Sequence, residues 1–375
     1  MKGSLSIFVT LFLLSSFLAG NAESNIIKDG VYKSYFGDSV IIESTYRNGK
    51  KDGSEKTFWP GGALQSERSY KEGLLEGTER YYYKTRELKA EKIYLHNKLE
   101  GIAKFYYRSG QVRSEQEYGG GRREGVFRFY NQKGELVLQQ LFKNDLREGI
   151  ATNYYAGVSL DSGYSSAAAF RKNRINAEIL YRAGKREGVA KYYYPEGSIK
   201  SEQTYKNNIR DGVVRYFSKE EKAQAEYTYV TGALHGLVRE FYSDGSVEME
   251  VPYEQNERQG KVRYFYPNGK LKRERLYQSG VSEGFDKQYY DNGKVSAQRY
   301  YVKGKLEGTG LNFYPTGTLK SELAYRMGYA DGPCKYYYED GRLKSEGVFL
   351  RGHLAGVWYY YDETGKVIDP VQHGA

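Results

Sequence analysis

Two stretches of the sequence decide the fold: YEQNERQGKVRYFYPNGKLKRE, residues 253–274, and YVKGKLEGTGLNFYPTGTLKSE, residues 301–322. Each begins with a tyrosine, has glycine seven residues later and has an aromatic residue twelve residues later. Thirteen aromatic residues start such a pattern, and we number each repeat from this residue as position 0. They are Tyr46, Tyr70, Tyr94, Tyr118, Phe142, Tyr181, Tyr205, Tyr229, Tyr253, Tyr277, Tyr301, Tyr325 and Phe349. Eleven of the twelve steps are 24 residues, and the step from Phe142 to Tyr181 is 39.

Small residues mark two chain reversals in every repeat. Position 3 is Gly in nine repeats, Asn in three and Asp in one, which are the residue types that tolerate a positive φ. Position 16 is Gly in ten repeats, often directly after Asn or Asp, which is a strong hairpin signal. Position 7 is always Gly and position 12 always aromatic. Each repeat is therefore predicted to hold two short strands, over positions 8–13 and 18–23.

The register of these strands follows from a tight turn at positions 15 and 16, which pairs residues whose positions sum to 31. Position 10, Lys or Arg in ten repeats, then faces position 21, which is usually Glu. Opposite charges across a ladder stabilise it by roughly 0.2–1 kcal/mol per pair. This register puts positions 10, 12, 19 and 21 on one face, with position 12 opposite position 19. Positions 11, 13 and 18 lie on the other face, which we expect to be the more buried.

The predicted fold class is all-β: an elongated, twisted, single-layer antiparallel array of β-hairpin repeats. We expect a signal peptide at residues 1–22, a partial repeat at 23–45, thirteen repeats at 46–367 and a C-terminal tail at 368–375. An insertion at about residues 156–174 accounts for the 39-residue step and is predicted to replace one hairpin turn.

The amino terminus has the pattern of an export signal. Lys2 precedes a mostly apolar run from Leu5 to Leu18, and the small residues Gly20 and Ala22 have the spacing of a cleavage site. Such a run is short for a membrane span, and the alternative is an uncleaved anchor. We therefore expect an exported protein, periplasmic or extracellular.

The two quoted stretches resemble the MORN-repeat variant that defines bacterial proteins of the YwqK family of toxin–antitoxin components. The resemblance covers about residues 30–367. It implies single-layer hairpin arrays that act as scaffolds or membrane-associated modules, and it implies no catalytic residue.

Little else in the chain points to chemistry. The four histidines have no metal-ligand spacing, and no glycine-rich phosphate-binding loop occurs outside the repeat pattern. We therefore expect no catalytic residue, cofactor or metal. The single cysteine, Cys334, cannot form an internal disulfide, and at position 9 we expect a small buried residue rather than a reactive thiol. The net charge of +10 is spread over finely mixed signs and is a weak indication of anionic partners.

The insertion holds the candidate contact residues. Long loops in repeat arrays are often functional or disordered, and the sequence leaves both open. If the loop binds a partner, the candidates are Tyr164, Phe170, Arg171, Lys172 and Arg174.

The leading functional hypothesis is a non-enzymatic, exported scaffold that binds another protein. The alternatives are association with an anionic membrane or cell-wall polymer and an antitoxin-like neutralising role. An enzyme is the weakest reading, because one loop rarely builds a preorganised site. No nucleic-acid partner is expected.

Overall fold

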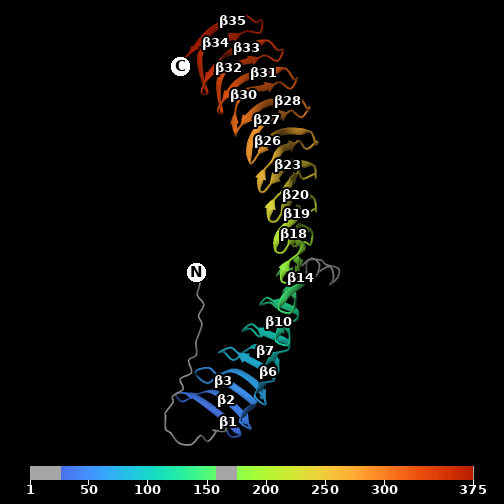
Figure 1. The fold of residues 1–375 in the computed structure, drawn as a ribbon, viewed down its shortest axis with the longest axis vertical. Helices are drawn as coiled ribbons and strands as arrows, with labels where there is room; N and C mark the ends of the chain where they lie inside the picture. The colour runs from blue at the N-terminus through green and yellow to red at the C-terminus, as the bar shows by residue number, and fades with distance from the viewer. Residues whose placement is uncertain (1–26, 158–174, 375) are drawn as a thin grey trace. The chain divides into compact units, whose positions relative to one another are not determined.

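The computed structural model describes residues 27–157 and 175–374. These residues form two units, divided after Lys98, and each unit is an open antiparallel sheet. Figure 1 shows the strands of each unit following one another in chain order. The described residues contain 35 strands and no helix, so none of them forms a helix that could cross a membrane. The predicted all-β hairpin class is confirmed.

The first unit begins with the hairpin of the partial repeat. Its strands are β1 (Gly30–Phe36), β2 (Ser39–Arg47), β3 (Lys50–Phe58), β4 (Leu64–Lys71), β5 (Leu74–Leu75), β6 (Gly77–Tyr82) and β7 (Leu88–Leu95). The division between the units falls within β8 (Lys98–Leu99).

The second unit carries the remaining repeats. Its strands are β9 (Gly101–Tyr106), β10 (Val112–Gly119), β11 (Arg122–Arg123), β12 (Gly125–Tyr130), β13 (Leu136–Lys143), β14 (Leu146–Tyr154), β15 (Ile175–Arg182), β16 (Lys185–Arg186), β17 (Gly188–Tyr193), β18 (Ile199–Lys206), β19 (Ile209–Phe217), β20 (Ala223–Val230), β21 (Ala233–Leu234), β22 (Gly236–Phe241), β23 (Val247–Glu254), β24 (Glu257–Arg258), β25 (Gly260–Phe265), β26 (Leu271–Gln278), β27 (Val281–Tyr289), β28 (Val295–Val302), β29 (Lys305–Leu306), β30 (Gly308–Phe313), β31 (Leu319–Arg326), β32 (Tyr329–Tyr337), β33 (Leu343–Leu350), β34 (His353–Tyr361) and β35 (Val367–His373). β14 pairs directly with β15 across the insertion, and residues expected in the tail form most of β35, which pairs with β34.

The turn at positions 2 and 3 is the tighter of the two reversals. Both residues have positive φ in every repeat; for example, φ is 50° at Gln255 and 69° at Asn256. Two consecutive positive φ values define the two-residue hairpin turn that matches the natural twist of the strands. The prediction for position 3 is confirmed, and position 2 shares the constraint although it is seldom glycine.

The second reversal is one residue longer than predicted. In the repeat that starts at Tyr253, the Gly269 N–H donates to the Tyr266 carbonyl at 2.8 Å, and the Tyr266 N–H donates to the Lys270 carbonyl at 2.8 Å. These two bonds join Tyr266 to Gly269 and Lys270, so the loop consists of the three residues between Tyr266 and Lys270, at positions 14–16. Among these three, only Gly269 has a positive φ.

This longer loop shifts the register near the turn. Position 12 pairs with position 18, as Phe265 pairs with Leu271, and position 19 is skipped. From position 11 toward position 8, the position numbers of paired residues again sum to 31, as in the pairing of Arg263 with Glu274. The extra residue is a β-bulge, which absorbs the one-residue shift. The predicted pairing of position 10 with position 21 is confirmed, and the pairing of position 12 with position 19 is wrong.

The bulge also changes one of the predicted faces. Position 18 lies on the face of positions 10, 12 and 21, not with position 11 as predicted, because its partner is position 12. The face that carries position 11 is the more buried, as predicted. Its most buried side chains come from positions 9 and 20, for example Val262, 1% exposed, and Ser321, 3% exposed.

Position 13 joins successive repeats of the second unit. A tyrosine hydroxyl at this position donates to the carbonyl at position 12 of the next repeat, at 2.7–2.9 Å, in eight places. The donors are Tyr107, Tyr155, Tyr194, Tyr242, Tyr266, Tyr290, Tyr314 and Tyr338. The polar tip of tyrosine thus binds repeat to repeat while its ring packs, which explains why tyrosine recurs at position 13.

Candidate binding surface

Arginines line part of the more buried face in the second unit. Position 5 is arginine in four consecutive repeats, at Arg123, Arg147, Arg186 and Arg210. Each guanidinium lies over the aromatic ring at position 0 of the next repeat, with distances to the ring centroid of 4.6, 5.2, 4.2 and 5.5 Å. We call these four residues and the rings beneath them the arginine face. Cation–π contacts of this kind contribute about 0.5–2 kcal/mol each.

Three of these arginines have no carboxylate partner among the described residues. Arg147 donates to the Tyr181 hydroxyl at 3.2 Å, Arg186 to the Asn208 carbonyl at 3.1 Å, and Arg210 to the Gln203 side chain at 3.2 Å. Arg123 differs, since its Nε lies 3.4 Å from the Asp145 carboxylate. The arginine face therefore presents an excess of positive charge.

At position 9 of two other repeats, a buried carboxylate neutralises neighbouring cations. In the first unit, Glu55 forms ion pairs with Lys51 and Arg68. In the second, Asp286, 1% exposed, forms ion pairs with Arg273 and Arg275. Burial alone would raise the pKa of Asp286, but hydrogen bonds from the two arginines outweigh it and hold the pKa below its usual range. The described part of the arginine face has no such buried carboxylate at Arg147, Arg186 or Arg210. Arg258, which lies 5.3 Å from the Tyr277 ring centroid, resembles these three arginines.

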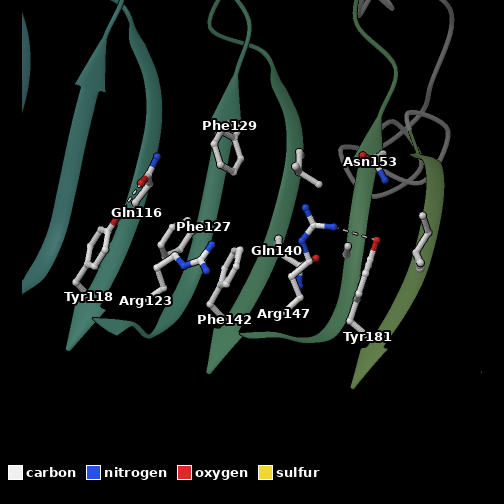
Figure 2. A pocket seen from close by; sticks show the side chains of 13 residues that line it. Gln116, Tyr118, Arg123, Phe127, Phe129, Gln140, Phe142, Arg147, Asn153 and Tyr181 are labelled. Carbon is white, nitrogen blue, oxygen red and sulfur yellow. Dashed lines mark hydrogen bonds between the residues drawn. The ribbon is translucent and has the colours of Figure 1, made fainter. Parts of the chain in front are cut away.

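Two arginines of the arginine face, Arg123 and Arg147, border a recess of about 600 Å³. Figure 2 shows Arg123 and Arg147 beside it, with Phe127, Phe142 and Tyr181 on the same side of the strands. The side chains that line it come from β10 to β15 and are Gln116, Tyr118, Arg123, Phe127, Phe129, Leu138, Gln140, Phe142, Arg147, Ala151, Asn153, Ile179 and Tyr181.

Local sequence changes open this recess. Position 11 is aromatic in the repeats before and after, at Phe129 and Tyr192, but it is Asn153 in this one. Position 9 likewise changes from Phe127 to the small Ala151. Asn153 leaves room above the sheet that both neighbouring repeats fill with a ring, and Ala151 leaves room that the preceding repeat fills with Phe127. The recess therefore combines an aromatic floor with two arginines at its border.

The candidate contact residues in the insertion, Tyr164, Phe170, Arg171, Lys172 and Arg174, lie outside the described residues. The strands on either side of the insertion, β14 and β15, both line the recess. The arginine face itself was missed by the sequence reasoning. The sequence does show that arginine recurs at position 5. The meaning of this pattern becomes clear only when the structure places the position-0 rings beside these arginines.

The opposite face carries a charge ladder, formed by Lys or Arg at position 10 and Glu at position 21. Two successive Glu residues each pair with a cation on both sides. Glu226 lies 2.9 Å from Arg215 and 3.4 Å from Arg239. Glu250 then lies 3.1 Å from Arg239 and 3.8 Å from Arg263. The predicted ladder is confirmed, and because its charges alternate it offers no net charge to a partner.

Cys334 is buried, as predicted, with 1% of its surface exposed. Burial raises the pKa of its thiol to about 11, although an interaction with the Gly347 backbone lowers it somewhat. At pH 8 almost no thiolate is present, and the thiolate is the reactive form. We expect a thiol reagent to label the native protein only as fast as the surrounding repeats open, and the denatured protein within minutes. Rapid labelling of the native protein, followed by absorbance, would contradict the buried position.

The described residues contain no group of three or more His, Cys, Asp or Glu side chains arranged to hold a metal ion. What the arginine face can do chemically is bind anions. A guanidinium has five N–H donors, and those not already used can bind a carboxylate or phosphate.

Eight segments of the chain match the family model of the MORN repeat variant, over residues 51–72, 99–118, 186–207, 234–255, 258–279, 287–303, 306–326 and 330–350. These segments, a little under half of the chain, match the MORN repeat variant. Seven of the eight segments start at position 5, so the family's unit and the 24-residue repeat coincide. MORN repeats are generally protein-binding or membrane-binding modules.

No curated protein matches the chain. Solved structures align with it at low identity. The wild-type TCP10 domain of Danio rerio CPAP, in complex with a STIL peptide, aligns at 10% identity and a TM-score of 0.16, over 86% of this chain and 100% of that one. A Photorhabdus luminescens Tc holotoxin pore aligns at 12% identity and a TM-score of 0.14, over 91% of this chain and 22% of that one. The complex TcdB2-TccC3-Cdc42 aligns at 10% identity and a TM-score of 0.12, over 90% of this chain and 25% of that one.

Proposed function

We propose that this protein is an exported, non-catalytic binding scaffold that holds a partner protein on the arginine face. The observation that carries the proposal is the run of position-5 arginines over aromatic rings, three of them without a carboxylate partner among the described residues. The MORN-variant repeats support a binding role, and the signal-like residues 1–22 support export. Aromatic residues and arginine are also the residue types that dominate the energetics of protein interfaces.

An affinity capture from the native envelope and culture supernatant tests this proposal. The bait is the full chain, compared with a variant carrying Arg147→Glu, Arg186→Glu and Arg210→Glu. We expect the wild-type chain to retain partners that the variant loses. A control with Lys143→Glu, Arg182→Glu and Lys206→Glu makes the same charge change at position 1 of the same three repeats, on the opposite face. Equal losses from both variants, or from neither, would contradict a role for the arginine face.

A second candidate is association with an anionic membrane or cell-wall polymer. The net charge of +10 favours it, and so does the absence of carboxylate partners for Arg147, Arg186 and Arg210 among the described residues. Such binding would weaken steeply as salt screens the charges. Sedimentation with anionic vesicles at low and physiological salt separates this candidate from protein binding.

A further inference from the structure

We propose that the arginine face binds an extended acidic segment of the partner, with one carboxylate at every third residue. This inference rests on the proposed function and adds the chemistry and spacing of the partner. Three arginines carry it, Arg147, Arg186 and Arg210, because they lie in line on successive hairpins without carboxylate partners among the described residues.

The spacing follows from the sheet. Arg147 is on β14 and Arg186 on β16, and the pairing of β14 with β15 and of β15 with β16 places them two strands apart. Arg210 is on β19, and it is again two strands beyond Arg186. Neighbouring strands lie about 4.8 Å apart, so successive arginines are about 10 Å apart. The 39-residue step in the sequence does not interrupt this spacing.

A chain in the polyproline II conformation has the matching period. It rises about 3.1 Å per residue with three residues per turn, so every third side chain points the same way, about 9 Å from the last. An ordinary β-strand does not match, because its side chains alternate and residues three apart point to opposite sides. The segment would therefore cross the strands, with Asp or Glu at i, i+3 and i+6.

Aromatic rings position the three arginines for contact with carboxylates. Each guanidinium lies over a ring at position 0, with its carbon 5.2 Å from the ring centroid for Arg147, 4.2 Å for Arg186 and 5.5 Å for Arg210. Support from a ring reduces the side-chain freedom lost on binding, and the guanidinium edge suits a two-pronged carboxylate contact. The recess beside Arg147, with Leu138 and Ile179 in its lining, can take an apolar side chain of the same segment.

A peptide fits this surface better than a membrane does. The cations form a line on a face that also has a recess of about 600 Å³, and a chain can follow both, whereas a flat bilayer cannot enter a recess. The charge ladder on the opposite face is balanced, so the whole molecule does not present a uniformly basic surface.

Synthetic peptides with a fluorescent label test the proposal against the full chain. One peptide of twelve residues carries Glu at every third position among Ala, Pro and Gln; its partner has the same composition with the Glu residues contiguous. We expect fluorescence anisotropy to show tighter binding of the periodic peptide. The variant Arg147→Gln, Arg186→Gln, Arg210→Gln should bind it about tenfold or more weakly, since three charge-assisted contacts are lost.

Two further variants keep the test sound. Lys143→Gln, Arg182→Gln, Lys206→Gln removes the same charge from the opposite face and should change binding less than about twofold, as an effect of net charge alone. Arg147→Lys, Arg186→Lys, Arg210→Lys keeps the charge but loses the two-pronged contact, and should give intermediate binding. It also serves if the glutamine variant does not fold.

Three outcomes would overturn the proposal: no binding of the periodic peptide, equal binding of the contiguous peptide, or an equal loss in the opposite-face variant. Binding of vesicles with anionic lipid but of neither peptide would assign the face to a membrane. Because the capture experiment uses native partners, a partner lost only from the arginine-face variant would keep the proposed function even if the peptides fail.

Discussion

Replacing Asp286 with alanine is expected to destabilise the repeats around it by about 3–5 kcal/mol, because it leaves two partly buried arginines without their counter-ion. Asp286 is 1% exposed, and its carboxylate accepts two hydrogen bonds of 2.8 Å from Arg273 and another from Arg275. The measurement is denaturant unfolding followed by circular dichroism. Asp291→Ala, an exposed loop position on the adjoining turn, is the control and should change stability by less than about 0.5 kcal/mol.

The neighbouring repeat suggests a second variant, in which apolar residues replace the whole buried ion-pair group. There the equivalent positions are Met249, Val251 and Val262, which pack as an apolar cluster. Transplanting them gives the triple variant Arg273→Met, Arg275→Val, Asp286→Val. We expect it to be as stable as the wild type or more so, because a buried ion pair rarely outperforms well-packed apolar residues. A triple variant as unstable as Asp286→Ala would contradict this account of the site.

Acid should remove the same stabilisation. The folded chain holds the pKa of Asp286 below its usual range, so the stabilisation is complete at neutral pH and above. It is lost as the pH falls through the pKa that Asp286 has in the folded chain. The difference in stability between the wild type and Asp286→Ala should therefore shrink in strong acid.

Gly212→Val is expected to cost about 3 kcal/mol, through backbone strain and crowding together. Gly212 has a φ of 110°, which side chains with a Cβ rarely adopt, and a Cβ there would lie 3.0 Å from the Thr204 methyl group. Thermal unfolding measures the loss. The effect should be local to the repeats that β18 and β19 join, because repeat arrays are stabilised by nearest neighbours.

Gly269→Asn is the matched control. Gly269 also has a positive φ, 78°, but no atom lies within 4 Å of where its Cβ would be. The same position holds Arg86 and Glu221 in other repeats, with φ of 79° and 61°. Asparagine tolerates this conformation, so a loss below about 1 kcal/mol is expected. Equal losses at Gly212 and Gly269 would mean that the crowding at position 7 has no effect.

The sequence predicts those features that every repeat shares. The positive φ at position 3 and the facing of positions 10 and 21 are visible because the same residue types recur in most repeats. The bulge at position 19 is not visible, because it follows from a loop of three rather than two residues. That one-residue difference decides which face position 18 occupies.

Features that occur in a single repeat escape sequence reasoning. Gly347 occupies position 22 because Trp358 lies across it: a Cβ on Gly347 would be 2.3 Å from the indole ring. The two residues belong to different repeats, so no repeat reveals the conflict alone. Asp286 and the recess at Asn153 are departures of the same kind. The arginine face is partly predictable. The sequence shows that its arginines recur, but only the structure shows which rings lie beneath them.

Photo-crosslinking of the periodic acidic peptide to the full chain tests the central claim most directly. With a benzophenone group at the middle of the peptide, the crosslinked residues are identified by mass spectrometry. The account predicts crosslinks on β12 to β19 at positions of the arginine face and its recess, such as Phe129, Leu138 and Ile179. Crosslinks on the charge ladder, or spread evenly along the chain, would contradict it.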